Sequence, residues 1–226
     1  FKTLILSLPV LYLRFILFNL RRTLMHKSFI IKIIVFCLVT IKVSAIEKVI
    51  LFGDSLMAGY GLPNEQHLSV VLQKSLEFDG HNIEIINGSV SGSTSAGGLN
   101  IAEWTLSENN IDLMILCLGA NDMLRGINPK ETKNNLEEII QIAKNKNIKV
   151  IIAGMIAPTS YGFAYKKSFD KIFSDLSKKH KLQLIPFLLE GVAQNPKFNL
   201  SDGMHPNDQG TIIIGNTLKK AILENL

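Results

Sequence analysis

Cysteine is nearly absent from this 226-residue chain, which has only Cys37 and Cys117. Cys37 lies in an apolar stretch near the amino terminus that we expect to be removed. Cys117 would then have no partner for an intramolecular disulfide, so the composition excludes a disulfide-stabilised scaffold. Because Cys117 sits inside an apolar run, we expect a small core residue rather than a reactive thiol.

Acidic residues are absent from residues 1–45, which contain seven Lys and Arg residues. The whole chain has a formal charge of +5, but the remaining 181 positions hold 17 Lys and Arg against 19 Asp and Glu. A nucleic-acid-binding protein is expected to carry its basic surface on the folded domain. The net charge of −2 for residues 46–226 therefore argues against nucleic acid as a partner.

The amino-terminal region also lacks an uninterrupted apolar run of the roughly 18 residues that a membrane-spanning helix needs. Reading from Met25, the basic pair His26-Lys27 precedes an apolar run at residues 33–41 and the small residues Ser44 and Ala45. This is the layout of an export signal cleaved after Ala45.

We therefore expect three segments. Residues 25–45 are predicted to be a signal peptide and residues 46–226 a single mature domain that is periplasmic or secreted, with membrane contact only during export. Residues 1–24 contain a second apolar stretch, interrupted by Pro9 and Arg14, and are predicted to be an upstream or leader extension. The alternative is an uncleaved membrane anchor.

From Ile46 onward, short apolar runs alternate with amphipathic stretches, which is typical of βαβ units and a parallel sheet. Strands are predicted at residues 48–52, 83–87, 113–118, 149–154 and 183–185. Helices are predicted at residues 66–78, 98–108, 129–145, 165–180 and 208–224. The pattern indicates one three-layer α/β domain without a linker or an internal repeat.

The first predicted strand runs directly into Gly53-Asp54-Ser55. Loops at the carboxyl ends of parallel strands are where α/β folds bind their ligands. Ser55 is therefore a candidate nucleophile. The alternative is an ordinary strand-closing turn, because Gly, Asp and Ser are common turn residues.

Two further strand ends carry groups that could bind an oxyanion. The backbone N–H of Gly92 lies in a loop of small residues that a ligand could approach closely. The Asn121 side chain is a donor that stays neutral at every working pH. For Gly92, the alternatives are a simple Gly/Ser loop or a phosphate-binding loop, although neither a Walker spacing nor a G-x-G-x-x-G spacing is present. For Asn121, the alternative is a turn or a helix cap.

The loop before the last predicted helix contains Asp202 and, three residues later, His205. This spacing lets one short loop present the carboxylate to the imidazole Nδ1 and leave Nε2 free for a serine hydroxyl. A structural histidine is the alternative.

Together, Gly53-Asp54-Ser55, Gly92, Gly119-x-Asn121-Asp122 and Asp202-x-x-His205 resemble the SGNH (GDSL-type) hydrolase superfamily, particularly its periplasmic thioesterase I, protease I, lysophospholipase L1 and arylesterase branch. The resemblance covers the chain from Val49 to the final helix. It implies a flavodoxin-like three-layer α/β/α sandwich with a five-stranded parallel sheet of order 2-1-3-4-5. It also implies hydrolysis of small esters, acyl thioesters or lysophospholipids without a metal or other cofactor. Separately, we expect the protein to be a monomer.

The resemblance also implies roles for individual residues. Ser55 would be the nucleophile, His205 the general base and later acid, and Asp202 the group that orients the imidazole. The oxyanion hole would consist of the Ser55 N–H, the Gly92 N–H and the Asn121 side chain. Position 120 is Ala where relatives often have Gly, a conservative departure beside the site.

We further expect Tyr161 and Phe163, in the loop after the fourth strand, to line an apolar substrate groove; packing over the adjacent helix is the alternative. Asp54 is expected to brace its loop, and Asp122 to be structural. Three alternative functions remain: a metal-dependent phosphoesterase, a non-enzymatic flavodoxin-like binding module and a membrane-anchored interaction protein. The first is disfavoured because only one well-placed imidazole is available to bind a metal.

Overall fold

The computed structural model describes Asn19, residues 47–107 and residues 110–226. The predicted leader extension and signal peptide therefore lie outside the described residues, apart from Asn19. Within the described part of the chain, no helix is both long and apolar enough to cross a membrane.

Residues 47–226 contain one parallel sheet of order β2-β1-β3-β4-β5. The strands are β1 (Glu47–Gly53), β2 (Ile83–Asn87), β3 (Leu113–Cys117), β4 (Lys149–Ala153) and β5 (Gln183–Ile185). This topology confirms the predicted flavodoxin-like fold class.

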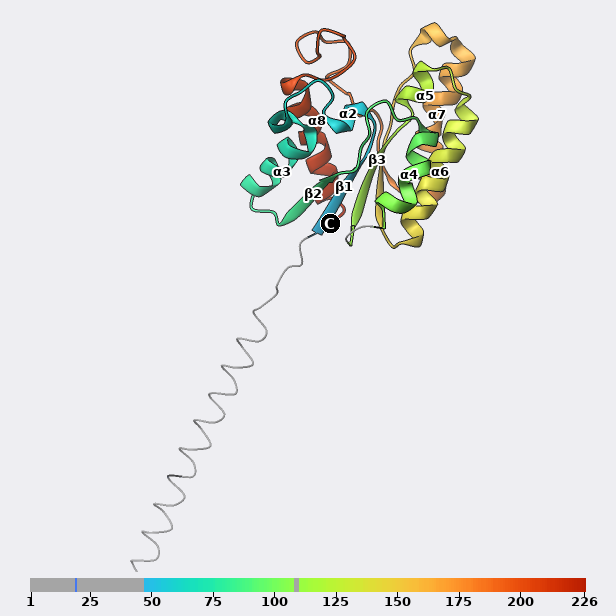
Figure 1. Ribbon diagram of the computed structural model, residues 1–226. Coiled ribbons are helices and arrows are strands. Elements are labelled where there is room, and N and C mark those ends of the chain that lie inside the picture. Colours follow the sequence, from blue (N-terminus) through green and yellow to red (C-terminus); the bar gives the residue numbers. More distant parts are fainter. Residues whose placement is uncertain (1–18, 20–46, 108–109) are drawn as a thin grey trace, which may run out of the picture. The chain divides into compact units, whose positions relative to one another are not determined.

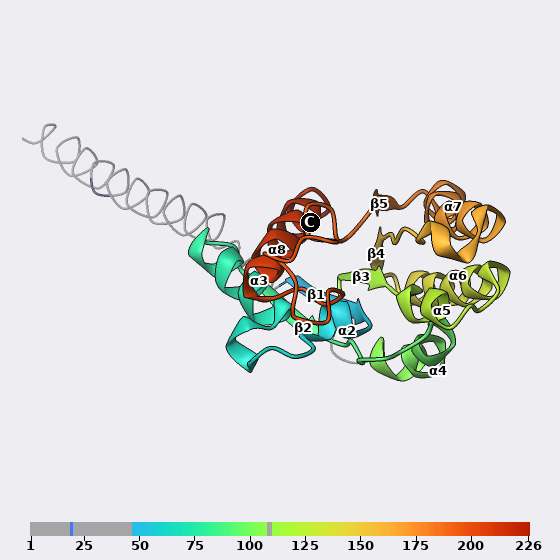
Figure 2. The same ribbon diagram turned by 90° about the horizontal axis from the view of Figure 1, so that it is seen from above.

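Helices cover both faces of the sheet (Figures 1 and 2). One face carries α3 (Leu68–Phe78) and α8 (Asp208–Leu223), and the other carries α4 (Ser95–Thr105), α6 (Pro129–Asn145) and α7 (Phe163–His180). The short helices α2 (Ser55–Ala58) and α5 (Ala120–Leu124) follow β1 and β3, and the 3-10 turns η1 (Asn64–Gln66) and η2 (Thr159–Tyr161) precede α3 and α7. Because both faces are covered, β1 and β3 are almost continuously apolar and buried.

The register between β1 and β3 places the functional loops. Phe52 pairs with Leu116 and Gly53 pairs with Cys117, so the two strands end at the same level. The turns that carry Ser55 and Asn121 therefore leave the sheet side by side. Cys117 is a fully buried free thiol in this register, as expected.

Most predicted elements agree with the structure to within one or two residues, and α6 agrees at both ends. The exception is α4, predicted at residues 98–108 but present at Ser95–Thr105. Its start was missed because Gly97 and Gly98 disfavour a helix locally. The Thr94 side chain compensates by accepting a hydrogen bond from the Gly97 N–H at 3.1 Å.

The segment between β5 and α8 folds back on itself before the last helix. An isolated antiparallel bridge joins Asn199 to Pro206, the Asn207 N–H donates to the Phe198 carbonyl at 2.9 Å, and the Leu200 N–H donates to the His205 carbonyl at 2.8 Å. These bonds close a tight loop around Asp202 and His205.

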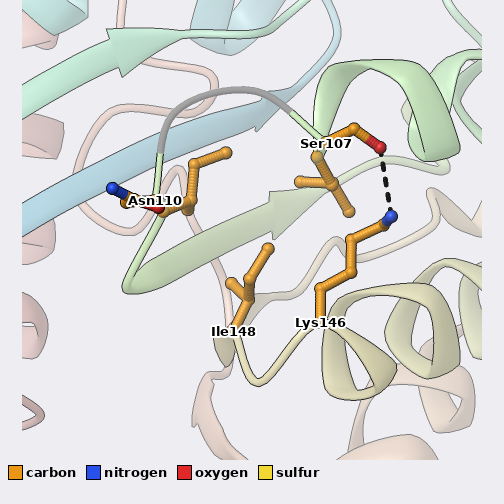
Figure 3. Close-up of a pocket in the computed structure, with 6 residues that line it drawn as sticks. Ser107, Asn110, Lys146 and Ile148 are labelled. Atoms are coloured by element: carbon orange, nitrogen blue, oxygen red, sulfur yellow. Dashed lines mark hydrogen bonds between the residues drawn. The ribbon is translucent and has the colours of Figure 1, made fainter.

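At the opposite edge of the sheet, where β3 and β4 begin, lies a small cavity of about 260 Å³ (Figure 3). Lys146 Nζ donates to Ser107 Oγ at 3.1 Å across one side of it. None of the predicted site residues lines this cavity.

Two glycines of α8 provide a test of this packing. A Cβ at position 210 would lie 2.2 Å from the Phe198 carbonyl oxygen, whereas a Cβ at position 215 would lie 3.7 Å from Val71 Cγ1, an ordinary contact. We expect Gly210→Ala to destabilise the protein by about 1–3 kcal/mol through overpacking. Gly215→Ala should instead stabilise it by up to about 1 kcal/mol, because alanine is the better helix former.

Urea unfolding of both variants measures these changes. Since the two substitutions are chemically identical and lie in the same helix, an equal response at both positions would contradict the close approach of α8 to the loop that carries His205.

Candidate active site

Ser55 is the first residue of α2 and lies directly beyond β1. The helix begins there because the Asp54 side chain accepts a hydrogen bond from the Leu56 N–H at 3.1 Å, which is an N-cap. As a first-turn residue, Ser55 has a backbone N–H without a partner inside the helix. Its hydroxyl and its N–H therefore both belong to a helix N-terminus, where negative charge is stabilised.

His205 bridges Ser55 and Asp202. Its Nε2 lies 2.9 Å from Ser55 Oγ, and its Nδ1 lies 2.6 Å from Asp202 Oδ2. The serine and the histidine are 150 residues apart in the chain. The arrangement is that of a nucleophile, a base and an orienting carboxylate, in which each side chain is within hydrogen-bond distance of the next.

Asp202 is held as an anion by its own loop. The backbone N–H groups of His205 and Met204 donate to Asp202 Oδ1 at 3.0 and 2.9 Å. These bonds, with the imidazole of His205, lower the pKa of Asp202 to about 2. On the other side, the Tyr60 ring packs on the His205 ring with centroids 4.4 Å apart. The imidazole is thus fixed by a permanent negative charge and by an aromatic neighbour.

Gly92 lies in the loop between β2 and α4, with a φ of +79° that favours glycine. The loop is attached to the end of β1, because Ser89 Oγ donates to the Leu51 carbonyl at 2.8 Å and the Val90 N–H donates to the Gly53 carbonyl at 3.0 Å. Arg125 adds a bond of 3.1 Å to the Gly92 carbonyl.

Asn121 lies in α5, and its Nδ2 donates to Asp54 Oδ2 at 3.3 Å. An amide nitrogen carries two hydrogens, so one remains for a ligand. Asp54 itself is fully buried. Burial is the largest effect on this carboxyl group and raises its pKa to about 6, against the hydrogen bonds from Leu56 and Asn121, which lower it.

Ser55, Gly92, Asn121 and His205 all line one cavity of about 880 Å³. Much of its wall is apolar, and it is formed by α5 and by the loops that follow β4 and β5. The apolar lining residues from these segments are Ala120, Met123, Leu124, Met155, Ile156, Ala157, Pro158, Phe187, Leu189 and Ala193.

Tyr161 and Phe163, which we expected to line the groove, are not among the residues that line this cavity. The Tyr161 ring packs against Tyr165 of α7, with centroids 5.4 Å apart, and its hydroxyl donates to the Leu124 carbonyl at 3.4 Å. Phe163 is 80% exposed at the start of α7. The sequence places both residues in the loop after β4 but does not give the direction of their side chains.

The sequence interpretation also missed the residues after β5 that do line the cavity. Phe187-Leu188-Leu189 is an apolar run at the carboxyl end of a predicted strand, which is a usual place for a binding wall. Of these three, Phe187 and Leu189 line the cavity, while Leu188 is buried in the core.

Two carboxylates near the site, those of Asp54 and Asp202, are engaged by donors. Asp54 is bound by Leu56 and Asn121, and Asp202 by His205 and Met204. Among residues 47–107 and 110–226, no group of three or more His, Cys, Asp and Glu side chains is arranged to hold a metal ion.

Fold and site together define a class of enzyme: a hydrolase on a flavodoxin-like scaffold, with Ser, His and Asp at the carboxyl edge of the sheet. A model of the GDSL-like Lipase/Acylhydrolase family matches residues 51–211. The chain is 34% identical over 194 residues to an arylesterase of Vibrio mimicus, covering 86% of this chain and 96% of that protein.

It is also 30% identical over 185 residues to thioesterase 1/protease 1/lysophospholipase L1 of Escherichia coli K12, covering 82% of this chain and 88% of that protein. A crystal structure of TesA matches with a TM-score of 0.76 and 32% identity, covering 80% of this chain and all of that one. The chain therefore belongs to the GDSL-like lipase/acylhydrolase family. The predicted resemblance and the predicted enzyme class, an SGNH-type hydrolase of esters or thioesters, are confirmed.

The raised pKa of Asp54 has a measurable effect on stability. The folded state binds the proton of Asp54 more tightly than the unfolded chain does. The stabilisation of the fold by this proton is therefore fully present below pH 3.8, the ordinary pKa of the group, and is lost as the pH rises through about 6. The shift corresponds to about 3 kcal/mol. Relative to Asp54→Asn, the wild type should therefore lose stability by up to that amount over this pH range.

Urea unfolding of both proteins across the range measures the difference. Asp79→Asn is a control for this range: the hydrogen bond from Lys219 lowers the pKa of Asp79, so the stabilising contribution of this carboxylate is already present above pH 3.8 and the gap between Asp79→Asn and wild type should stay nearly constant. If the difference in unfolding free energy between wild type and Asp54→Asn does not change with pH, the raised pKa of Asp54 is contradicted.

Proposed function

We propose that this enzyme cleaves carboxylic esters and thioesters through an acyl-enzyme formed on Ser55. The observation that carries the proposal is the continuous contact from Ser55 Oγ to His205 Nε2 at 2.9 Å and from His205 Nδ1 to Asp202 Oδ2 at 2.6 Å. Because Ser55 and His205 also line the partly apolar cavity of about 880 Å³, a carbonyl group bound there would lie beside the hydroxyl.

In the first half-reaction, Ser55 Oγ attacks the substrate carbonyl while His205 Nε2 takes the hydroxyl proton. Asp202, whose low pKa keeps it ionised, balances the charge of the imidazolium. His205 then gives the proton to the departing alcohol or thiol, which leaves the acyl group on Ser55. In the second half-reaction His205 activates a water molecule, which releases the acid and restores the hydroxyl.

The negative charge on the tetrahedral oxygen would be bound by the Ser55 N–H, the Gly92 N–H and the Asn121 amide. Support comes from their common cavity and from the position of Ser55 at a helix N-terminus. In hydrolases of this kind the loss of one such donor costs about 2.7 to 4 kcal/mol of transition-state stabilisation.

The substrate class proposed here is an aryl ester, an acyl thioester or a lysophospholipid. The apolar walls formed by the loops after β4 and β5 suit an acyl chain or an aryl group. The names of the relatives, an arylesterase and a thioesterase 1/protease 1/lysophospholipase L1, support the same range.

We also propose that residues 25–45 direct export and that residues 46–226 act as a monomer in the periplasm or outside the cell. The order of basic, apolar and small residues in the amino-terminal segment supports this assignment. Contact with the membrane is then needed only during export.

The mechanism predicts that Ser55→Ala loses activity by at least about 10⁴-fold, because the residual binding groups cannot form an acyl-enzyme. A panel of p-nitrophenyl esters of graded acyl length, with an acyl-CoA and lysophosphatidylcholine, measures kcat/KM, and thermal unfolding verifies that the variant is folded. Hydrolysis that survives in Ser55→Ala but disappears in excess EDTA would overturn the serine mechanism in favour of a metal-dependent one, and bis-p-nitrophenyl phosphate added to the panel tests the phosphoesterase alternative itself.

The cavity walls predict chain-length preference. Phe187→Ala should change the ratio of kcat/KM for long and short acyl chains by about 10-fold, since it removes an apolar wall. The double variant Tyr161→Ala, Phe163→Ala should leave this ratio unchanged, because neither side chain lines the cavity. The same ester panel measures both, and a shift in the double variant without one in Phe187→Ala would overturn this account of the substrate site.

A further inference from the structure

Asp122 is a buried carboxylate that the mechanism does not use. Its side chain has no exposed surface. Oδ2 accepts a hydrogen bond from the Ser95 N–H at 2.7 Å, and Oδ1 accepts hydrogen bonds from Ser95 Oγ and, at 3.1 Å, from Thr132 Oγ1. Burial of a charge is costly unless hydrogen bonds satisfy it, and here three donors do so.

These three donors come from two helices other than the one that holds Asp122. Ser95 is the first residue of α4, Thr132 lies in the first turn of α6, and Asp122 lies in the first turn of α5. The carboxylate therefore lies where three helix N-termini meet, and each N-terminus favours a negative charge. Asn135 of α6 extends the network by donating to Ser95 Oγ at 2.9 Å.

The network ties together the two loops that carry the proposed oxyanion donors. Asn121 is adjacent to Asp122 in α5, and Ser95 follows Gly92 by three residues. At its other end the Gly92 loop is attached to β1 through Ser89 and Val90. Between these attachments, two links join the Gly92 loop to α5 among the described residues. Arg125, at the end of α5, makes an exposed bond to the Gly92 carbonyl at 3.1 Å, and the bonds from Ser95 to Asp122 form the fully buried link.

We propose that Asp122 is a positioning residue that sets the distance between the Gly92 N–H and the Asn121 amide, and thereby the fit of the oxyanion hole to the tetrahedral transition state. This inference rests on the proposed function. Asp122 would then affect the chemical step, because the hydrogen bonds from Gly92 and Asn121 to the carbonyl oxygen strengthen most when that oxygen becomes charged in the transition state.

Asp122→Asn keeps the size of the side chain but removes its charge and replaces one acceptor oxygen with a donor. The Ser95 and Thr132 hydroxyls, which both donate to the carboxylate, can then bond the amide nitrogen only by turning into acceptors, which changes the geometry of the network. A displacement of about 1 Å in a catalytic site can cost about 100-fold in rate. We expect kcat on a p-nitrophenyl ester to fall by about 10- to 100-fold with KM changed by less than about threefold, a smaller loss than removal of a whole donor.

Inhibition by an alkyl trifluoromethyl ketone measures how well the oxyanion hole binds a negatively charged oxygen, because the adduct of this ketone with a serine hydroxyl carries an oxyanion. Its Ki should rise by the same factor as kcat/KM falls. An unchanged kcat in Asp122→Asn, or a loss that appears in KM while the Ki of the ketone stays constant, would overturn the inference.

A second pair of variants tests the inference if Asp122→Asn does not fold. Ser95→Ala removes a donor on the side of the Gly92 loop, and Thr132→Val removes a donor on the side of α6. If Asp122 acts through the hole, Ser95→Ala lowers kcat several-fold, whereas Thr132→Val lowers Tm and leaves kcat near wild type. Losses of Tm alone in both variants show that the network is only structural, and equal losses of kcat show that the Gly92 side has no special part in setting the hole; either result overturns the inference.

The comparison also separates this inference from the proposed function. Failure of the proposed function would appear as retained hydrolysis in Ser55→Ala. Failure of the inference alone would appear as an inactive Ser55→Ala beside Asp122→Asn and Ser95→Ala variants with wild-type kcat.

Discussion

The pairing of β1 with β3 is the constraint on which the site depends. Because Gly53 lies opposite Cys117, the turns that follow the two strands emerge at the same level of the sheet. One turn carries Ser55 and the other carries Asn121, and the bond from Asn121 to Asp54 joins them. The loop with Gly92 is attached to the end of β1 by main-chain and Ser89 hydrogen bonds. A shift of this register would separate all of these groups.

Three aspartates around the site show how environment decides what a carboxyl group does. Asp202 lies in an exposed loop whose N–H groups hold it ionised, and its pKa is about 2. Asp54 is buried beneath the nucleophile turn, and burial raises its pKa to about 6. Asp122 is equally buried but is bound by three neutral donors. Only Asp202 contacts the imidazole, so only Asp202 is suited to orient the base.

The sequence predicted the sheet well because strands covered on both faces are continuously apolar, as β1 and β3 are. Residues 129–145 were predicted from an amphipathic pattern and agree with α6 at both ends, where the structure shows the Asn128 side chain capping the helix. The sequence did not predict α2 and α5, which are four and five residues long and too short for any periodicity. Likewise, Ser55 and His205 follow from local motifs, whereas the exposure of Phe163 depends on a side-chain direction that only tertiary packing sets.

Chemistry and substrate selection are built on different strands. The groups proposed for catalysis follow β1, β2 and β3 and precede α8, and buried or main-chain hydrogen bonds fix them to the sheet and to one another. Most of the apolar walls of the cavity follow β4 and β5, whose loops are joined by the Leu188 N–H bond to the Gly154 carbonyl at 3.0 Å, and Met123 and Leu124 of α5 complete them beside Asn121. Phe187 and Ile156 lie in the loops after β5 and β4 and not in the turns that carry Ser55 or Asn121, so a change in their size need not move the catalytic groups. This separation lets one scaffold keep a single acyl-transfer mechanism while its walls are adapted to different acyl groups.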